Sequence, residues 1–201
     1  EADALRRDFT VNGLFYDPLT EKIHDWVVGE KDLRAKIIHT LGKPEDRFGE
    51  GHLRMLRAVR FAARLGFEIE PKTFAAIQKL ASKIKLISAE RIRDELIKLF
   101  APPPLGAPAS CWRIEKDLLK NAGWKPALPE AARGLVLLRD SGLLKQILPE
   151  LAATVDCEQS PDFHPEGSVF NHLCLMLENL PANANPLLPS VVMLHDIAKP
   201  V

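Results

Sequence analysis

Four arginines recur at helical spacing within residues 50–67, EGHLRMLRAVRFAARLGF. At about 100° per residue, Arg54, Arg57, Arg60 and Arg64 fall within roughly a third of a helix circumference. Apolar side chains occupy the opposite side, so this segment predicts an amphipathic helix with one buried face and one stripe of guanidinium groups. The apolar residues of the expected buried face are Met55, Leu56, Val59, Ala62 and Ala63.

The arginine stripe, defined as Arg54, Arg57, Arg60 and Arg64, has two interpretations. No acidic residue lies between its first and last members, so the four guanidinium groups repel one another. An anionic partner relieves this repulsion, and the planar fork of Arg suits phosphates and base edges better than the point charge of Lys. Alternatively, the stripe belongs to a surface helix whose arginines pair with acids from elsewhere in the fold. The spacing alone favours neither interpretation.

Strand signals are confined to the N-terminal part of the sequence. Residues Phe9 to Tyr16 and Lys22 to Val28 are rich in β-branched and aromatic side chains, and Asp17 to Thr20 between them has turn chemistry. These segments predict a β-hairpin. One helical turn over Asp32 to Lys36 and a short apolar segment, Ile37-Ile38, are expected to follow.

Helical periodicity dominates after this point. The stretch Ala101 to Pro129, which is rich in proline and glycine, predicts a linker or an irregular insertion between the helices. The expected helices are Glu50–Leu65, Pro71–Ile84, a helix capped by Ser88 that ends at Phe100, Pro129–Leu138, Leu143–Ala152, Val169–Leu180 and Leu188–Ala198.

Composition narrows the function classes and the compartment. The formal net charge of the 201 residues is +0, so any nucleic-acid binding must come from local patches such as the arginine stripe. Cys111, Cys157 and Cys174 lie far apart and show neither zinc spacing nor a disulfide framework, as is typical of the reducing cytoplasm. No signal peptide and no apolar run long enough to cross a bilayer is present. A cytoplasmic protein without membrane contact is therefore expected.

A second basic cluster precedes the hairpin, in residues 6–12, RRDFTVN. Alone, two arginines beside an Asp favour a salt bridge at the end of a strand. Together with DWVVGEKDL at 25–33 and LRMLRAVRF at 53–61, however, this cluster closely resembles the class II tRNA nucleotidyltransferase and poly(A) polymerase family. The segments SAERIRDELIKLF at 88–100 and SGLLKQILPEL at 141–151 extend the resemblance, which is weak between them.

The resemblance implies roles for individual residues. Arg7 contacts the incoming nucleotide, and Asp8 is a candidate for the ribose. Arg54 reads the base edge of ATP or CTP, while Arg57 and Arg60 support the base and the triphosphate. Arginine donors suit this task because they present a fixed hydrogen-bond pattern to a base, while phosphates satisfy the remaining charge.

The sequence departs from the family pattern at two points. Gly51 follows Glu50 where the family has an Asp, which leaves no side chain there to accept from an exocyclic amine. The carboxylates that hold Mg²⁺ in the palm subdomain are expected upstream of residue 1, because the spacing of Asp3, Asp8 and Asp17 does not place a carboxylate pair on one strand face. The sequence is therefore expected to be a fragment that lacks the N-terminal part of the palm and is itself inactive in nucleotidyl transfer.

Imidazoles and a carboxylate gather near the C-terminal end of the sequence. His164 lies in HPEG, His172 falls on a predicted helix, and His195 and Asp196 close the last helix. Their order resembles the HD superfamily of metal-dependent phosphohydrolases, in which such side chains converge on a divalent ion. The resemblance implies a metal site at His172, His195 and Asp196. The alternative is a set of buried, hydrogen-bonded histidines.

Together these features predict a mainly α-helical fold with a small β remnant of a nucleotidyltransferase palm. The expected units are the palm remnant at 1–45, the neck with its base-recognition helices at 46–101, a linker and body helices at 102–158, and the start of an HD domain at 159–201. The expected activity of the complete enzyme is addition of CMP and AMP to tRNA 3′ ends, with tRNA, ATP and CTP as partners. The alternatives are poly(A) addition, an HD-type phosphohydrolase and a non-catalytic RNA-binding remnant.

Overall fold

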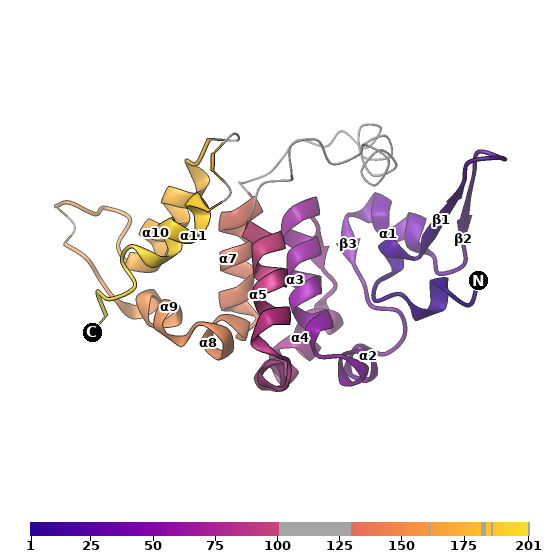
Figure 1. Ribbon diagram of the computed structural model, residues 1–201, viewed down its shortest axis with the longest axis horizontal. Helices are drawn as coiled ribbons and strands as arrows, with labels where there is room; N and C mark the ends of the chain where they lie inside the picture. Colours follow the sequence, from indigo (N-terminus) through magenta and orange to yellow (C-terminus); the bar gives the residue numbers. More distant parts are fainter. Residues whose placement is uncertain (101–129, 161, 182–183, 186, 201) are drawn as a thin grey trace.

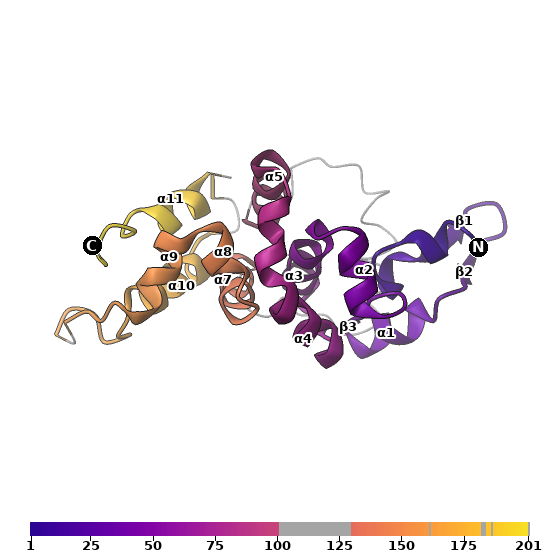
Figure 2. The same ribbon diagram turned by 90° about the horizontal axis from the view of Figure 1, so that it is seen from below.

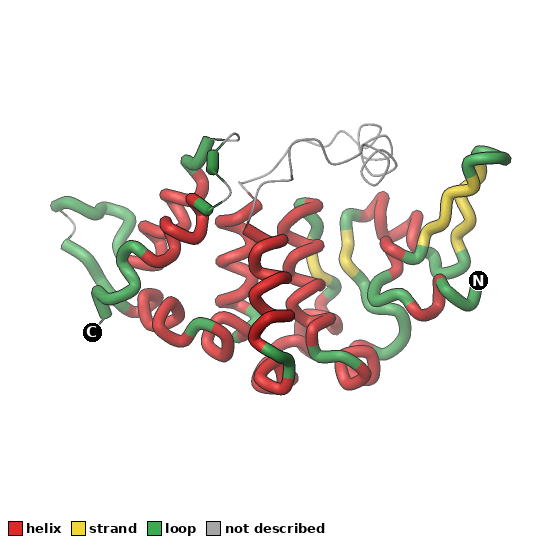
Figure 3. Tube along the Cα trace, in the orientation of Figure 1, coloured by secondary structure: helices red, strands yellow, loops and turns green. Residues whose placement is uncertain are grey.

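The chain forms a row of helices with a small β-hairpin at one end, as Figure 1 shows. The computed structural model describes residues 1–100, 130–160, 162–181, 184–185 and 187–200, and the structural statements below concern these residues. Strands occupy only short stretches near the N-terminus, as the tube in Figure 3 makes plain. The predicted mainly α-helical fold is confirmed.

The predicted hairpin is present but shorter than expected. Strands β1 (Leu14–Asp17) and β2 (Lys22–Asp25) pair antiparallel, with Leu14 opposite Asp25. The Asp17 carboxylate stabilises the turn by accepting from the backbone N–H of Leu19 at 2.9 Å.

The residues before β1 are not a strand, contrary to expectation. Two short 3-10 helices, Ala4–Arg6 and Thr10–Asn12, occupy this part of the chain. The Asn12 side chain accepts from the backbone N–H of Phe9 at 3.1 Å, and this local bond competes with strand pairing.

The segment that carries the arginine stripe forms two helices and not one. Helix α2 covers Pro44–Glu50, and helix α3 covers Leu53–Leu65. Gly51 between them is extended, with φ −170° and ψ 102°. The prediction of a single helix from Glu50 was therefore wrong at its start, because the extended backbone of Gly51 ends α2 before α3 begins.

Short elements surround these two helices. Helix α1 (Gly29–Ala35) leads into strand β3 (Ile37–Ile38), which pairs parallel with β4 (Glu68–Ile69). Both strands lie against α3. The predicted helical turn and the apolar pair after it are thus confirmed, and the turn is longer than expected.

The next helices follow the predicted positions closely. Helix α4 covers Pro71–Leu80, a 3-10 helix covers Ala81–Leu86, and helix α5 covers Ala89–Phe100. The Glu70 side chain caps α4 by accepting from the backbone N–H of Thr73 at 2.6 Å. The expected linker at 101–129 lies outside the described residues.

The secondary-structure elements described from residue 130 onward are all helices. They comprise α7 (Glu130–Asp140), α8 (Leu143–Ile147), α9 (Pro149–Ala153), a 3-10 helix (Thr154–Asp156), α10 (Val169–Glu178) and α11 (Leu188–Leu194). The predicted helix over Leu143–Ala152 is split because Pro149 starts a new helix at its first turn.

Helix α3 lies at the centre of the fold. It packs against α5 and α7, and α7 in turn packs against α10, an arrangement that Figures 1 and 2 show from two sides. The five apolar residues predicted for its buried face are all buried. The opposite face of α3 carries the arginine stripe, which is therefore held on a rigid, fully packed helix.

Candidate functional site

The N-terminal half of the arginine stripe is joined to the RRD segment by one carboxylate. Asp8 lies between the two short 3-10 helices, and its backbone carbonyl accepts from the N–H of Leu41 at 3.3 Å. Arg54 Nε donates to Asp8 Oδ1 at 3.0 Å, and Arg57 Nε donates to Asp8 Oδ2 at 2.6 Å. Asp8 thereby holds two guanidinium groups from successive turns of α3 side by side.

Glu95 on α5 is the acid partner of the middle of the stripe. Glu95 is only 3% exposed, and its carboxylate accepts from Arg60 Nε at 2.7 Å and from Lys98 Nζ at 3.1 Å. Arg57 Nη1 lies 4.0 Å from the same carboxylate. Burial alone raises the pKa of Glu95, but the Arg60 charge and the Lys98 hydrogen bond outweigh it, so this pKa lies below its ordinary value of 4.5.

The break between α2 and α3 brings further groups to Arg54. Arg54 Nη1 donates to Glu50 Oε2 at 2.6 Å and to the backbone carbonyl of Arg47 at 2.8 Å. Arg47 Nη1 donates to the same Glu50 oxygen at 3.0 Å, and Arg47 Nη2 bonds the backbone carbonyl of Leu5. The hydrogen bonds from Arg54 and Arg47 lower the pKa of Glu50. A polar hollow of about 360 Å³ opens beside these groups.

The last arginine of the stripe has a different environment. Arg64 Nη1 lies 2.6 Å from Glu130 Oε2 on α7, far along the helix from the RRD segment. Arg60, one turn earlier, has its guanidinium carbon 4.3 Å from the Phe61 ring centroid. All four arginines of the stripe therefore meet acids supplied by the fold, as the surface-helix interpretation expected.

Arg7, the first arginine expected at the nucleotide, points away from α3. Its Nη2 donates to Asp3 Oδ2 at 2.7 Å, and its guanidinium carbon lies 5.4 Å from the Phe15 ring centroid. The structure thus brings together Asp8, Arg54 and Arg57, while Arg7 lies beside them on the hairpin side.

Sequence reasoning missed Glu95, although the sequence carries a signal for it. Within the predicted α5 helix, Glu95 lies three residues after Ile92 and four before Leu99, so it falls on the apolar face. A charged residue on a buried face is almost always paired. Its partner could not be named, because Arg60 is 35 residues away in sequence.

A histidine cluster forms at the C-terminal end of the fold. His172 on α10 shares one group with His195 and Asp196, which follow α11, and a second group with His164 and Glu166. In each group the candidate ligand atoms lie within 4.8 Å of one another. The three residues expected to hold a metal ion are therefore brought together from two separate helices.

Hydrogen bonds fix the side chains of this cluster. His172 Nδ1 donates to Glu166 Oε1 at 2.5 Å, and His164 Nδ1 donates to the same oxygen at 3.1 Å. His195 Nδ1 donates to the backbone carbonyl of Val192 at 2.7 Å. The Glu166 carboxylate accepts from the Glu166 backbone N–H and from His172, and these two bonds lower the pKa of Glu166 to about 2.

Asp196 already faces a cation of the chain itself. Lys199 Nζ donates to Asp196 Oδ2 at 2.7 Å and to the Gln159 side chain at 2.8 Å. Burial raises the pKa of Asp196, but the Lys199 hydrogen bond and the nearby His195 outweigh it, so this pKa lies below 3.8. Two imidazoles and a carboxylate are a donor set that suits Zn²⁺, Mn²⁺, Fe²⁺ or Co²⁺, so the residues present fit a divalent ion.

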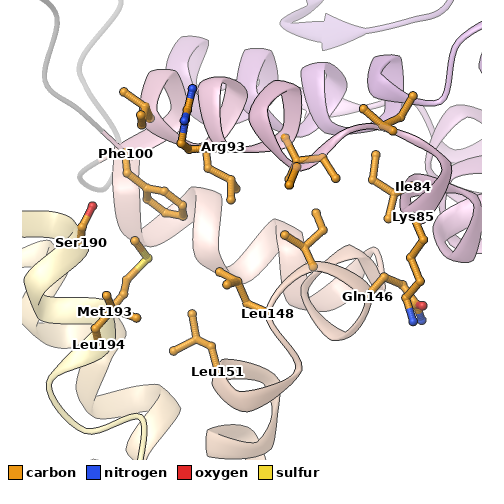
Figure 4. A pocket seen from close by; sticks show the side chains of 16 residues that line it. Ile84, Lys85, Arg93, Phe100, Gln146, Leu148, Leu151, Ser190, Met193 and Leu194 are labelled. Carbon is orange, nitrogen blue, oxygen red and sulfur yellow. The ribbon is translucent and has the colours of Figure 1, made fainter.

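An apolar pocket of about 590 Å³ lies between these two sites, among α5, α8, α9 and α11. Figure 4 shows Leu148, Leu151 and Met193 directed into it. It offers few polar groups to orient a ligand, and it lies apart from the arginine stripe and from the histidine cluster.

Comparison with family models matches two separate parts of the chain, on either side of α2 and α3. Residues 1–39 match the family described as "Poly A polymerase head domain". Residues 66–104 match the family described as "Probable RNA and SrmB- binding site of polymerase A". The first match contains the RRD segment, and the second contains Glu95 and the rest of α5.

Named relatives extend the match over most of the chain. "Poly(A) polymerase I" of Escherichia coli O6:H1 is 46% identical over 99 residues, which are 49% of this chain and 21% of that protein. "CCA-adding enzyme" of Lactobacillus delbrueckii subsp. bulgaricus is 37% identical over 183 residues, which are 91% of this chain and 40% of that protein. The chain is similar to the CCA-adding enzyme and poly(A) polymerase family. The resemblance of the RRD and arginine-helix motifs to this nucleotidyltransferase family is thus confirmed.

A solved structure shares the fold of this chain. The structure described as "The complex structure of CCA-adding enzyme with ATP" has a TM-score of 0.52 and 20% sequence identity, and it covers 82% of this chain and 33% of that one. The chain thus spans between about a fifth and two fifths of the length of these two named relatives. In the part of this chain that the structure describes, no helix is long and apolar enough to cross a membrane.

Proposed function

We propose that this chain is the nucleotide-recognising part of a tRNA nucleotidyltransferase, which adds CMP and AMP to tRNA 3′ ends from CTP and ATP. The observation that carries the proposal is the Asp8 carboxylate, which joins the RRD segment to Arg54 and Arg57 across 46 residues or more of sequence. Two motifs that the family shares thereby form one site. A reaction on tRNA with CTP and ATP places the enzyme in the cytoplasm.

The proposed roles follow from the chemistry of the side chains. Arg54 reads the base edge, because its planar fork presents a fixed donor pattern beside the polar hollow. Arg57 and Arg60 support the base and the triphosphate, and the Phe61 ring attracts the Arg60 guanidinium, whose carbon lies 4.3 Å from the ring centroid. Arg7 contacts the nucleotide from the hairpin side, and Asp8 serves the ribose.

Nucleotide binding in this site is an exchange of partners. Asp8 and Glu50 occupy the donors of Arg54 before a nucleotide is bound. A base or phosphate oxygen is expected to replace the Glu50 oxygen at Nη1, while Asp8 keeps its bond to Nε and accepts from a ribose hydroxyl with a remaining lone pair. The released carboxylate stays solvated, because the Glu50 side chain is 53% exposed.

We place the units at 1–45 for the palm remnant, 46–101 for the neck, 102–158 for the linker and body helices, and 159–201 for the start of an HD domain. The Mg²⁺-binding carboxylates of the palm are supplied by the complete enzyme from outside these residues. Mg²⁺ bound by those carboxylates would supply Lewis-acid chemistry for the transfer. Residues 1–201 alone are therefore inactive in transfer.

The test is incorporation of labelled CTP and ATP into tRNA that lacks its 3′ end. The complete enzyme is expected to add CMP and then AMP, and residues 1–201 are expected to add nothing above a control without protein. A long run of AMP as the product would replace CCA addition with poly(A) addition, and extension by residues 1–201 would refute the placement of the carboxylates.

A second function is favoured by the histidine cluster. We propose that His172, His195 and Asp196 bind a divalent ion, because their ligand atoms lie within 4.8 Å of one another. A bound ion would supply a Lewis acid for hydrolysis of a phosphate ester. Metal-dependent cleavage of a chromogenic phosphodiester tests this activity, and His172→Ala is expected to abolish it. Equal cleavage by His172→Ala would refute the assignment.

A further inference from the structure

The two ligand groups in the histidine cluster share His172, and one imidazole cannot serve both in the same way. His172 Nδ1 lies 2.5 Å from Glu166 Oε1. An ionised carboxylate only accepts hydrogen bonds, so this nitrogen carries the proton. Nε2 is then the one nitrogen of His172 with a free lone pair for a metal ion.

We propose that Glu166 is a positioning residue that fixes the tautomer of His172 and so presents Nε2 to the ion held with His195 and Asp196. This inference rests on the proposed metal site. A carboxylate behind a ligating imidazole fixes the orientation of the ring and raises its basicity. Glu166 belongs to the loop before α10 and not to the ligand set itself.

His195 provides an internal comparison. Its Nδ1 donates to the backbone carbonyl of Val192 at 2.7 Å, so the lone pair lies on Nε2, which is 3.3 Å from Asp196 Oδ2. Both imidazoles thus have Nδ1 engaged by an oxygen acceptor. The acceptor for His195 is part of the main chain, whereas the acceptor for His172 is a side chain that a substitution can remove.

The loop holds the Glu166 carboxylate in place from several directions. His164 Nδ1 donates to the same Oε1 atom at 3.1 Å, and the Asn171 side chain donates to the Glu166 backbone carbonyl at 3.1 Å. Gly167 has φ +88°, a conformation that favours glycine and turns the chain into α10. The Glu166 side chain is only 16% exposed. Its position is therefore set by the loop, before any ion is bound.

The tautomer is measured directly by ¹⁵N NMR of the metal-free full chain with labelled histidine, at alkaline pH. In the wild type, His172 is expected with its proton on Nδ1. In Glu166→Ala, His172 is expected to shift toward the form protonated on Nε2, while His195 keeps its spectrum. An unchanged His172 tautomer in Glu166→Ala would overturn the positioning role, whether or not the wild type binds metal.

Metal affinity is measured by titration of the same proteins with Co²⁺. Glu166→Ala is expected to weaken binding by about 10- to 100-fold. Glu166→Gln keeps one acceptor oxygen and is expected to recover part of this loss. Glu158→Gln removes one negative charge from the same loop, at an exposed residue outside both ligand groups, and is the control for charge alone.

Two affinity results would count against the proposal. An equal loss of Co²⁺ affinity in Glu166→Ala and Glu158→Gln would reduce Glu166 to a general electrostatic effect. No binding of Co²⁺ by the wild type would remove the metal site itself, and the NMR result would then decide whether Glu166 still fixes the imidazole.

Discussion

At the scale of single residues, the arginines of α3 differ in the acidic side chains to which they are bound. Arg54 is bound to Asp8 and to Glu50, and Glu50 lines the polar hollow. Arg64 is bound to Glu130, in the contact between α3 and α7. The same residue type on one stripe therefore lies beside the proposed nucleotide site at one end and in a helix contact at the other.

The first prediction separates these two ends. In the complete enzyme, Arg54→Ala is expected to weaken ATP binding by about 1.5–3 kcal/mol, the usual loss for one charged hydrogen-bonding partner. Arg64→Ala is expected to leave ATP affinity nearly unchanged and to lower stability by breaking the contact with Glu130. Calorimetry with ATP checks the first effect and urea unfolding the second. Equal losses of affinity would contradict the assignment.

Glu95 gives a prediction in pH. Its pKa is lowered in the folded chain, so its ion pairs stabilise the fold above its ordinary value of 4.5 and lose that contribution as the pH falls through the lowered pKa. Glu95→Gln is expected to cost about 1.5–3 kcal/mol at neutral pH. The difference between the two proteins should shrink steadily as the pH falls below 4.5. Urea unfolding across this range measures it, and a difference that stays constant would refute the role of the ionised carboxylate.

At the scale of elements, the helices were predictable because their apolar periodicity is local. Helices α4, α5, α7 and α10 lie within a few residues of the predicted bounds. The boundary at Gly51 was not predictable, since the helical spacing of the arginine stripe continues back to Glu50. In the structure, the extended backbone of Gly51 separates α2 from α3. The 3-10 turns before β1 were missed for a similar reason, because one side-chain bond from Asn12 decides them.

Gly51 itself supports a prediction about base selection. Its φ of −170° is open to any residue, and a Cβ there would meet only Arg54 Nε, at 3.9 Å. Gly51→Asp therefore places a carboxylate beside the proposed base-reading group without a clash. Selection of CTP and ATP over GTP and UTP is expected to sharpen by about 1–3 kcal/mol, the value of a good paired contact.

The ratios of incorporation efficiency for all four nucleotides, before and after the substitution, measure this effect in the complete enzyme. Gly51→Ala is the control, because it adds the Cβ without the carboxylate. Ratios that stay constant or become less selective in Gly51→Asp would show that the turn between α2 and α3 has no part in reading the base.

The contact between α5 and α7 gives a prediction about packing. A Cβ on Gly134 would lie 2.8 Å from Leu99 Cδ1, and Leu99 is fully buried. Gly134→Val is expected to destabilise the fold by about 1–3 kcal/mol through overpacking. Gly49→Val is the matched control, because nothing lies within 4 Å of a Cβ at that exposed helical position. Urea unfolding that ranks the two variants equally would contradict the overpacking of Leu99.

At the scale of the whole molecule, the two candidate sites lie at opposite sides of one core. The buried apolar residues form a single connected cluster within the described part of the chain, from Phe9 near the hairpin to Met193 on α11. The sequence could supply the candidate residues of both sites from their motifs. The sequence could not show which candidate residues pair with Asp8, Glu95 or Glu166, because long-range pairing depends on how the helices pack.

This shared core leads to a prediction about metal binding. A divalent ion at His172, His195 and Asp196 should stabilise the folded chain by about 2.7 kcal/mol at a concentration of 100 Kd. For a chain of this size the Tm is expected to rise by about 5–10 °C, in one transition. Thermal unfolding with Co²⁺ and then with excess chelator checks the rise and its reversal. His172→Ala should show neither, and an identical rise in that variant would locate the ion elsewhere.

The carboxylate of Asp8 also has a consequence for preorganisation. A free arginine side chain samples many rotamers, and fixing it costs up to about 2 kcal/mol of conformational entropy. Asp8 already holds Arg54 and Arg57 through their Nε atoms, and Glu95 holds Arg60 in the same way. Three long side chains of α3 are therefore ordered when the protein folds, and their entropy is not lost a second time when a nucleotide binds.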